Sequence, residues 1–247
     1  MSADVTSAKT EHGGRSAARE APGLVGKLLR LLLWLFISLL FSILVECAGM
    51  TWWWPDEGLE HSRVMLEHEI GYLSGDLRSS ALVADTAAYA KAFADTAYAW
   101  LWQRTGLDAA IRWAGAPPPV EASALRHEIH EVYARIAHYV VAAATVTQVF
   151  AVRVAVVTLS MPAFGLAALM GALDGLVSRD LRRWGGGRES SFVYHHARRW
   201  VWPMFLLAWV LYLSLPFSLH PSLAILPFAA GVGVLVAVTT GSFKKHL

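Results

Sequence analysis

Residues 200–243 have the sequence WVWPMFLLAWVLYLSLPFSLHPSLAILPFAAGVGVLVAVTTGSF, which contains no Asp, Glu, Lys or Arg in 44 positions. A helix of about 20 apolar residues, rising 1.5 Å per residue, crosses a hydrocarbon layer of roughly 30 Å. The stretch is long enough for two such helices, residues 200–218 and 222–241, with His220-Pro221 as the tight turn between them. It therefore predicts a hairpin of two membrane-spanning helices.

The composition of the whole chain supports a membrane protein. Apolar residues make up 55% of the 247 positions and charged residues only 16%, against roughly 25% charged in a soluble domain. The net charge of +2 indicates neither sequence-specific nucleic-acid binding nor an acidic partner. A single cysteine, Cys47, excludes an internal disulfide framework.

A further span is predicted near the start of the chain, at residues 23–50. The tryptophans at 52–54 follow it, where indole rings favour the membrane interface, and Pro55 ends the helix. Glu46 before Cys47 does not fit a lipoprotein cleavage site, and the preceding region is long for a signal peptide, so we expect a retained anchor. Residues 1–22 are polar and without periodicity, which predicts a disordered cytoplasmic tail.

The apolar stretch from Ile136 to Ser178 is too long for one span and shows no turn that would make two. A charge at the bilayer centre costs ~2.5–3.5 kcal/mol on insertion scales, so Arg153 is expected at an interface and the span at residues 154–178. Pro162 should bend this span. Whether Val132–Val152 lies in the interface or outside the membrane stays open.

Small residues recur at helical spacing on two of the predicted spans. Gly171 and Gly175 form such a pair on the 154–178 span, and Ala229, Gly233 and Ala237 form a row on the last span. Faces of this kind allow close packing of membrane helices.

The region between the first two spans, residues 51–153, is polar. Its part at 51–135 carries 12 acidic and 7 basic residues, a net charge of −5. Val64, Leu66 and Ile70 indicate one helix, residues 84–102 indicate another, and the prolines at 117–119 interrupt the helices before a new one at Glu121. We expect a small helical extracytoplasmic region.

Lys and Arg set the orientation. Six arginines lie within the basic loop at residues 179–199, and Lys244 and Lys245 lie in the tail at 242–247; such clusters mark the cytoplasmic side. The fold class is therefore all-α: a polytopic bacterial inner-membrane protein with four transmembrane helices, a helical extracytoplasmic insert between spans 1 and 2, and both termini cytoplasmic.

The sequence contains only weak signals for catalytic groups. His127, Glu131 and His138 share a helix face near His130, but the spacing is one residue short of a zincin motif, so a solvated polar face is preferred to a metal site. Residues 185–190 lack the Lys-Ser/Thr ending of a phosphate-binding loop and follow no strand; a flexible break before a helix capped by Ser190 or Ser191 is expected instead. We expect no catalytic residues, metal or cofactor.

Two carboxylates near the ends of spans, Glu46 and Asp174, can be explained by helix packing or interfacial position, with ion transport as the alternative.

The basic loop is the candidate partner-binding surface, because arginine and aromatic side chains dominate the binding energy of protein interfaces. The predicted contact residues are Arg179, Arg182, Arg183, Arg188, Phe192, Tyr194, His195 and His196.

The same segment, RDLRRWGGGRESSFVYHHA at residues 179–197, resembles the integrating conjugative element membrane proteins, which are encoded among DNA-transfer genes and often beside the coupling ATPase. The resemblance implies a non-enzymatic inner-membrane scaffold that assists conjugative DNA transfer beside a type IV secretion apparatus, with the lipid bilayer and the coupling ATPase or other transfer proteins as partners. Alternatives are a small transporter or entry-exclusion protein and, less favoured, a metal-dependent membrane hydrolase. Mating assays with the deletion in donor or recipient, and metal analysis, would separate them.

Overall fold

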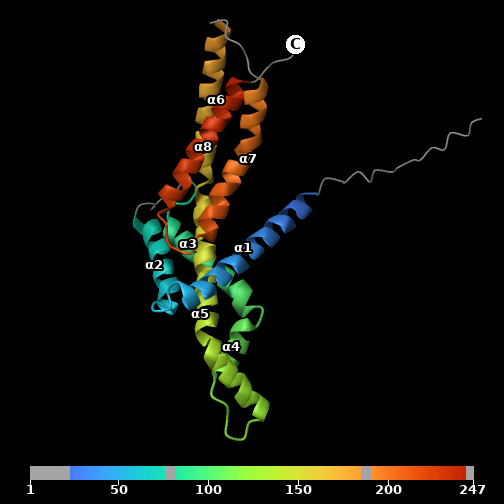
Figure 1. Ribbon diagram of the computed structural model, residues 1–247, viewed down its shortest axis with the longest axis vertical. Coiled ribbons are helices and arrows are strands. Elements are labelled where there is room, and N and C mark those ends of the chain that lie inside the picture. Colours follow the sequence, from blue (N-terminus) through green and yellow to red (C-terminus); the bar gives the residue numbers. More distant parts are fainter. Residues whose placement is uncertain (1–22, 76–81, 185–190, 243–247) are drawn as a thin grey trace, which may run out of the picture. The chain divides into compact units, whose positions relative to one another are not determined.

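The computed structural model describes residues 23–75, 82–184 and 191–242, and every regular element in these ranges is a helix (Figure 1). The helices are α1 (Leu24–Trp52), α2 (Leu59–Gly75), α3 (Thr86–Tyr98), the π-helix η1 (Ala99–Gln103), α4 (Leu107–Gly115), α5 (Ala124–Leu159), α6 (Met161–Trp184), α7 (Ser191–Ser214) and α8 (Pro221–Gly241). The all-helical class is therefore confirmed. The predicted disordered tail, residues 1–22, lies outside the described residues.

The chain divides into two compact units. The first ends at Leu35 and includes the first turns of α1. The second begins at Phe36 and contains the rest of α1 and all later helices. All contacts described below belong to the second unit.

The helices of the predicted insert begin and end for local reasons. α1 ends at Trp52, shortly before Pro55, as expected. α2 and α3 coincide with the two predicted helical runs. Asp85 caps α3, because its side chain accepts a hydrogen bond of 2.9 Å from the backbone N–H of Ala88.

α5 starts later than predicted. It begins at Ala124 and not at Glu121, and the backbone carbonyl of Ser123, the N-cap residue, accepts hydrogen bonds from the N–H groups of Arg126 and His127 at 2.9 and 3.3 Å. It runs for 36 residues to Leu159, so Val132–Val152 is one continuous helical segment.

A single residue, Ser160, separates α5 from α6. The N–H of Ser160 still donates to the Val156 carbonyl at 3.0 Å, and Ala124–Arg182 forms one helical stretch, so no turn divides the apolar stretch into two spans, as predicted. The bend expected from Pro162 stays a prediction. Proline has no N–H to donate to the carbonyl of Thr158, four residues earlier, and its ring crowds that carbonyl. Ser160 keeps a right-handed helical conformation, so α6 continues onward from α5 in Figure 1.

α6, α7 and α8 pack side by side, with α6 and α7 both against α8 (Figure 1). The predicted small-residue faces meet here, which confirms them. A Cβ added at Gly171 would lie 2.0 Å from the carbonyl oxygen of Gly233, and one at Gly175 would lie 1.9 Å from Oγ1 of Thr240. Contacts advance in the same direction along both helices, so α6 and α8 are parallel.

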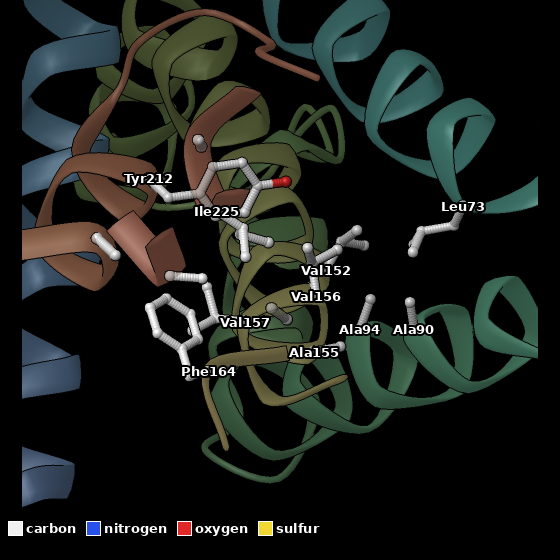
Figure 2. Close-up of a cluster of buried hydrophobic side chains, with 14 of the residues drawn as sticks. Leu73, Ala90, Ala94, Val152, Ala155, Val156, Val157, Phe164, Tyr212 and Ile225 are labelled. Carbon is white, nitrogen blue, oxygen red and sulfur yellow. The ribbon is translucent and has the colours of Figure 1, made fainter. Parts of the chain in front are cut away.

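The hydrophobic core lies where α2 and α3 meet α5 and the adjoining ends of α7 and α8. Figure 2 shows Leu73 of α2 beside Ala90 and Ala94 of α3, with Val152 and Val156 of α5 between them and the α7–α8 pair. The small alanines of α3 permit its close approach to α5. The insert is thus packed onto the apolar helices.

Three helical stretches of the described residues are long and apolar enough to cross a membrane: Leu24–Trp52, Ala124–Arg182 and Pro221–Gly241. α7 is not among them. Its first turns carry His195, His196, Arg198 and Arg199, and the helix ends at Ser214, four residues before the end of the span predicted at 200–218. The part of α7 that is both helical and uncharged is therefore shorter than a typical membrane-spanning helix.

Candidate functional site

A buried polar cluster joins α2, α5 and α7. Glu69, Arg153 and Tyr212 are 0%, 2% and 1% exposed. Arg153 Nε donates a 2.9 Å hydrogen bond to Glu69 Oε1, and Tyr212 OH donates one of 2.8 Å to Glu69 Oε2. Both oxygens of the buried carboxylate are therefore bonded.

The rest of the Arg153 guanidinium is directed at the α7–α8 connection. Nη2 donates to the carbonyl oxygen of Phe217 at 2.8 Å, and Nη1 donates to that of Leu215. Sδ of Met65 lies 3.4 Å from Nη2, and the hydroxyl of Ser218 donates to the Met65 carbonyl at 3.1 Å. Arg153 is thus level with the connection between two predicted spans and is ion-paired inside the protein, whereas its expected position at a membrane interface stays a prediction.

This cluster holds α2, α5 and α7 together. Ion pairing and hydrogen bonding offset the cost of removing both charges from water. The cluster links Glu69 of α2 to Arg153 of α5, which is 84 residues later in the chain. It also links Glu69 to Tyr212, near the end of α7.

A second polar contact holds the end of α1 to α2. Glu46 is buried at 2% exposure, and Nδ1 of His61 donates to its two carboxylate oxygens at 3.0 and 3.2 Å. The Trp54 ring stacks on His61 with 4.2 Å between ring centroids and lies across Gly49, where any Cβ would collide with it. This contact agrees with the predicted packing role of Glu46; Asp174 is exposed on α6.

The histidines at the start of α5 lie against backbone carbonyls. Nδ1 of His130 is 3.0 Å from the Ala114 carbonyl oxygen, and Nδ1 of His127 is 3.3 Å from that of Ser123. His138 packs on the ring of Tyr139. Within the described ranges, no group of three His, Cys, Asp or Glu residues is placed to hold a metal ion.

The predicted basic loop at 179–199 is helical on both sides. α6 continues to Trp184 and α7 begins at Ser191, so Arg179 and Arg182 lie on the last turns of α6, and Tyr194, His195 and His196 on the first turns of α7. Arg188 lies outside the described residues, as do the side chains of Arg183 and Phe192.

The side chain of Arg182 is exposed but also contacts the end of α8. Its Nη2 donates to the carbonyl oxygen of Gly241, the last residue of α8, and its Nε donates to that of Ser178 at 3.2 Å. A cation at a helix C-terminus satisfies the final carbonyls and favours the helix dipole. Arg182 therefore joins the ends of α6 and α8.

The Glu69–Arg153–Tyr212 cluster was missed by the sequence reasoning. The signal for half of it was present, because Arg153 is isolated in an apolar stretch and needs a counter-charge if buried. Nothing local distinguishes Glu69 from the other acidic residues of the insert.

Comparison with known proteins gives one family. Residues 53–244 match the family described as "DtrJ-like: IncC plasmid conjugative DNA transfer protein DtrJ-like". No curated protein and no solved structure matches the chain. The family description names a plasmid protein, so the link to conjugation is confirmed, and the narrower resemblance to integrating conjugative element proteins stays a prediction. Because the match spans most of the sequence, the chain belongs to the DtrJ-like family of conjugative DNA transfer proteins.

Proposed function

We propose that this protein is a non-enzymatic scaffold in the bacterial inner membrane, which docks the coupling ATPase or a neighbouring protein of the transfer apparatus. Membership in a family of conjugative DNA transfer proteins supports a role in conjugation. The docking surface is the set of exposed or half-buried basic and aromatic side chains at the C-terminal end of α6 and the N-terminal end of α7, referred to below as the basic end. Its described members are Arg179, Arg182, Tyr194, His195, His196, Arg198 and Arg199.

The composition of the basic end supports a protein contact. Arginine and aromatic residues are enriched where protein interfaces gain most binding energy. The ion pairs found in the described part of the chain use none of these arginines. Arg182 also bonds to the end of α8, whereas the charges of Arg179 and Arg199 are available to an acidic surface of a partner.

Four membrane crossings are supported by the packing of α6 and α8. Two parallel helices that both cross a bilayer require the chain between them to return through it, and α7 is the segment between them. α1 supplies the first crossing. With the basic end in the cytoplasm, both termini are cytoplasmic and α2–α4 are extracytoplasmic.

Reporter fusions test this topology. Alkaline phosphatase fused after Ala90 is expected to be active, because the enzyme folds only outside the cytoplasm, whereas fusions after Arg188 and at the C-terminus should be silent. Activity would be compared with the amount of each fusion protein. An active fusion at Arg188 would reverse the orientation, and an active C-terminal fusion would show an odd number of crossings.

Site-specific photo-crosslinking tests the docking surface. A photoreactive amino acid at His195, which is exposed on the first turns of α7, should crosslink the coupling ATPase or an adjacent transfer protein in donor cells. The same amino acid at Glu128, exposed on α5 in the extracytoplasmic part, is the matched control and should not. Products would be identified by mass spectrometry. A lack of crosslinks from His195, in cells that transfer DNA normally, would refute docking at the basic end.

A further inference from the structure

A groove of about 680 Å³ lies among α6, α7 and α8. Its lining is apolar except for one residue, Arg198 of α7. Phe164 and Ala168 of α6 form one side, Trp202 and Phe205 of α7 the other, and Phe164 meets Phe205 edge-on with 5.1 Å between ring centroids. Phe164 and Phe205 are therefore in contact within this apolar groove.

Arg198 lies at the end of the groove nearest the C-terminus of α8. Met204 of α7 packs against Gly231 of α8, and the two helices form a hairpin. Arg198 is six residues before Met204, about 9 Å along α7, whereas Gly241 is ten residues beyond Gly231, about 15 Å along α8. Arg198 thus lies about one helical turn inside the end of α8, where the headgroups of the cytoplasmic leaflet are expected.

The guanidinium of Arg198 has unused hydrogen-bonding capacity. Nη1 donates to the hydroxyl of Tyr194 at 3.1 Å, which orients the side chain. No carboxylate of the described residues forms an ion pair with it. Planar guanidinium groups are well suited to two-point bonding with phosphate.

We propose that this groove binds one phospholipid with a net negative headgroup, with an acyl chain along Phe164, Trp202 and Phe205 and the phosphate on Arg198. Basic pockets between membrane helices on the cytoplasmic side are suited to such lipids. The positive charge of Arg198 attracts a headgroup with net negative charge and repels the ammonium of a zwitterionic headgroup. The site rests on the bilayer location proposed above, and not on docking to transfer proteins.

The size of the groove favours a lipid chain over a helix. A membrane-spanning helix about 10 Å wide and 30 Å long occupies roughly 2,400 Å³, several times the groove volume. Pockets of ~300–1,000 Å³ are typical for small molecules. A partner helix or a second copy of the chain would leave most of its surface outside the groove.

Native mass spectrometry of the full-length protein tests the site. Purified protein would be reconstituted with equal amounts of phosphatidylglycerol and phosphatidylethanolamine carrying the same acyl chains, then released from detergent and weighed. Wild type should retain one phosphatidylglycerol in preference to phosphatidylethanolamine, by about tenfold, because Arg198 can bond to the phosphate of both lipids but repels the ammonium of phosphatidylethanolamine. Arg198→Gln should lose the preference.

Two further variants separate the site from general folding. Arg199→Gln removes the same charge from the next residue of α7, which lines a different groove with His196, Trp200 and Pro203, and should keep the preference. Gly165 lines the groove and a Cβ added there meets nothing within 4 Å, so Gly165→Leu should fill part of the groove and reduce retention of both lipids.

The outcomes are distinguishable. Equal retention of both lipids by wild type, or an unchanged preference in Arg198→Gln, would overturn the site, as would a dimer that excludes lipid. A wild-type protein that stays soluble without detergent and retains no lipid would instead overturn the bilayer location.

Discussion

Replacing Glu69 by Ala is expected to destabilise the protein by about 3–5 kcal/mol, because the change leaves the Arg153 guanidinium buried without its counter-charge. That cost is a large part of the ~5–15 kcal/mol that stabilises a typical domain. The protein should accumulate to much lower levels in the membrane, and the remaining fraction should unfold at lower temperature in detergent. Thermal unfolding followed by circular dichroism would measure the loss.

Matched variants assign this loss to the ion pair. Glu67→Ala removes an exposed carboxylate from the same helix and should change stability by less than about 0.5 kcal/mol. Tyr212→Phe keeps the ring and removes one hydrogen bond to the carboxylate, so it should cost only about 1.5–3 kcal/mol.

A double variant, Glu69→Leu with Arg153→Met, should recover much of the stability, since apolar side chains of similar volume leave no unpaired charge. Stability of Glu69→Ala equal to that of wild type would show that the carbonyls of Leu215 and Phe217 suffice for Arg153.

Gly171→Leu is expected to separate α6 from α8. A Cβ at this position would lie 2.0 Å from the carbonyl oxygen of Gly233, and backbone atoms cannot move aside as a flexible side chain can. Overpacking costs about 1–3 kcal/mol, and the leucine also removes the close approach on which small-residue packing depends. The same unfolding measurement applies.

The control is Gly165→Ala on the same helix. A Cβ there meets open space, and replacing a helical glycine by alanine stabilises a helix by roughly 0.5–1 kcal/mol. The two substitutions should therefore have opposite signs. If Gly171→Leu were as stable as Gly165→Ala, α6 and α8 would not pack through this face.

Local patterns accounted for much of the helical structure. Pro55, the prolines at 117–119 and the His220-Pro221 pair mark helix ends or starts because the proline ring removes an N–H and restricts the backbone. The spacing of Gly171 and Gly175 on α6, and of Ala229, Gly233 and Ala237 on α8, identified two packing faces because residues four apart share one side of a helix. Each of these signals acts within a few residues.

The ends of the helices beside the basic loop were predicted only in part. α7 starts at Ser191, where a helix capped by Ser190 or Ser191 was expected, whereas the helical extension of α6 to Trp184 was not predicted. Arg182 can remain helical there because its guanidinium binds the terminal carbonyl of α8, a contact between segments far apart in the chain. Charged residues alone indicate that a segment is exposed to solvent. An exposed helix end meets that condition as well as a loop does.

The sequence by itself determined the helical class, the apolar stretches, most helix ends and the small-residue faces, since hydrophobic period, proline chemistry and residue size act locally. Only the tertiary structure decided that Arg153 pairs with Glu69, that His61 binds Glu46, and that the α6–α8 groove ends at Arg198. These contacts depend on which helix faces meet. A buried charge requires a partner wherever in the chain that partner lies, and composition leaves several acidic residues equally able to supply it.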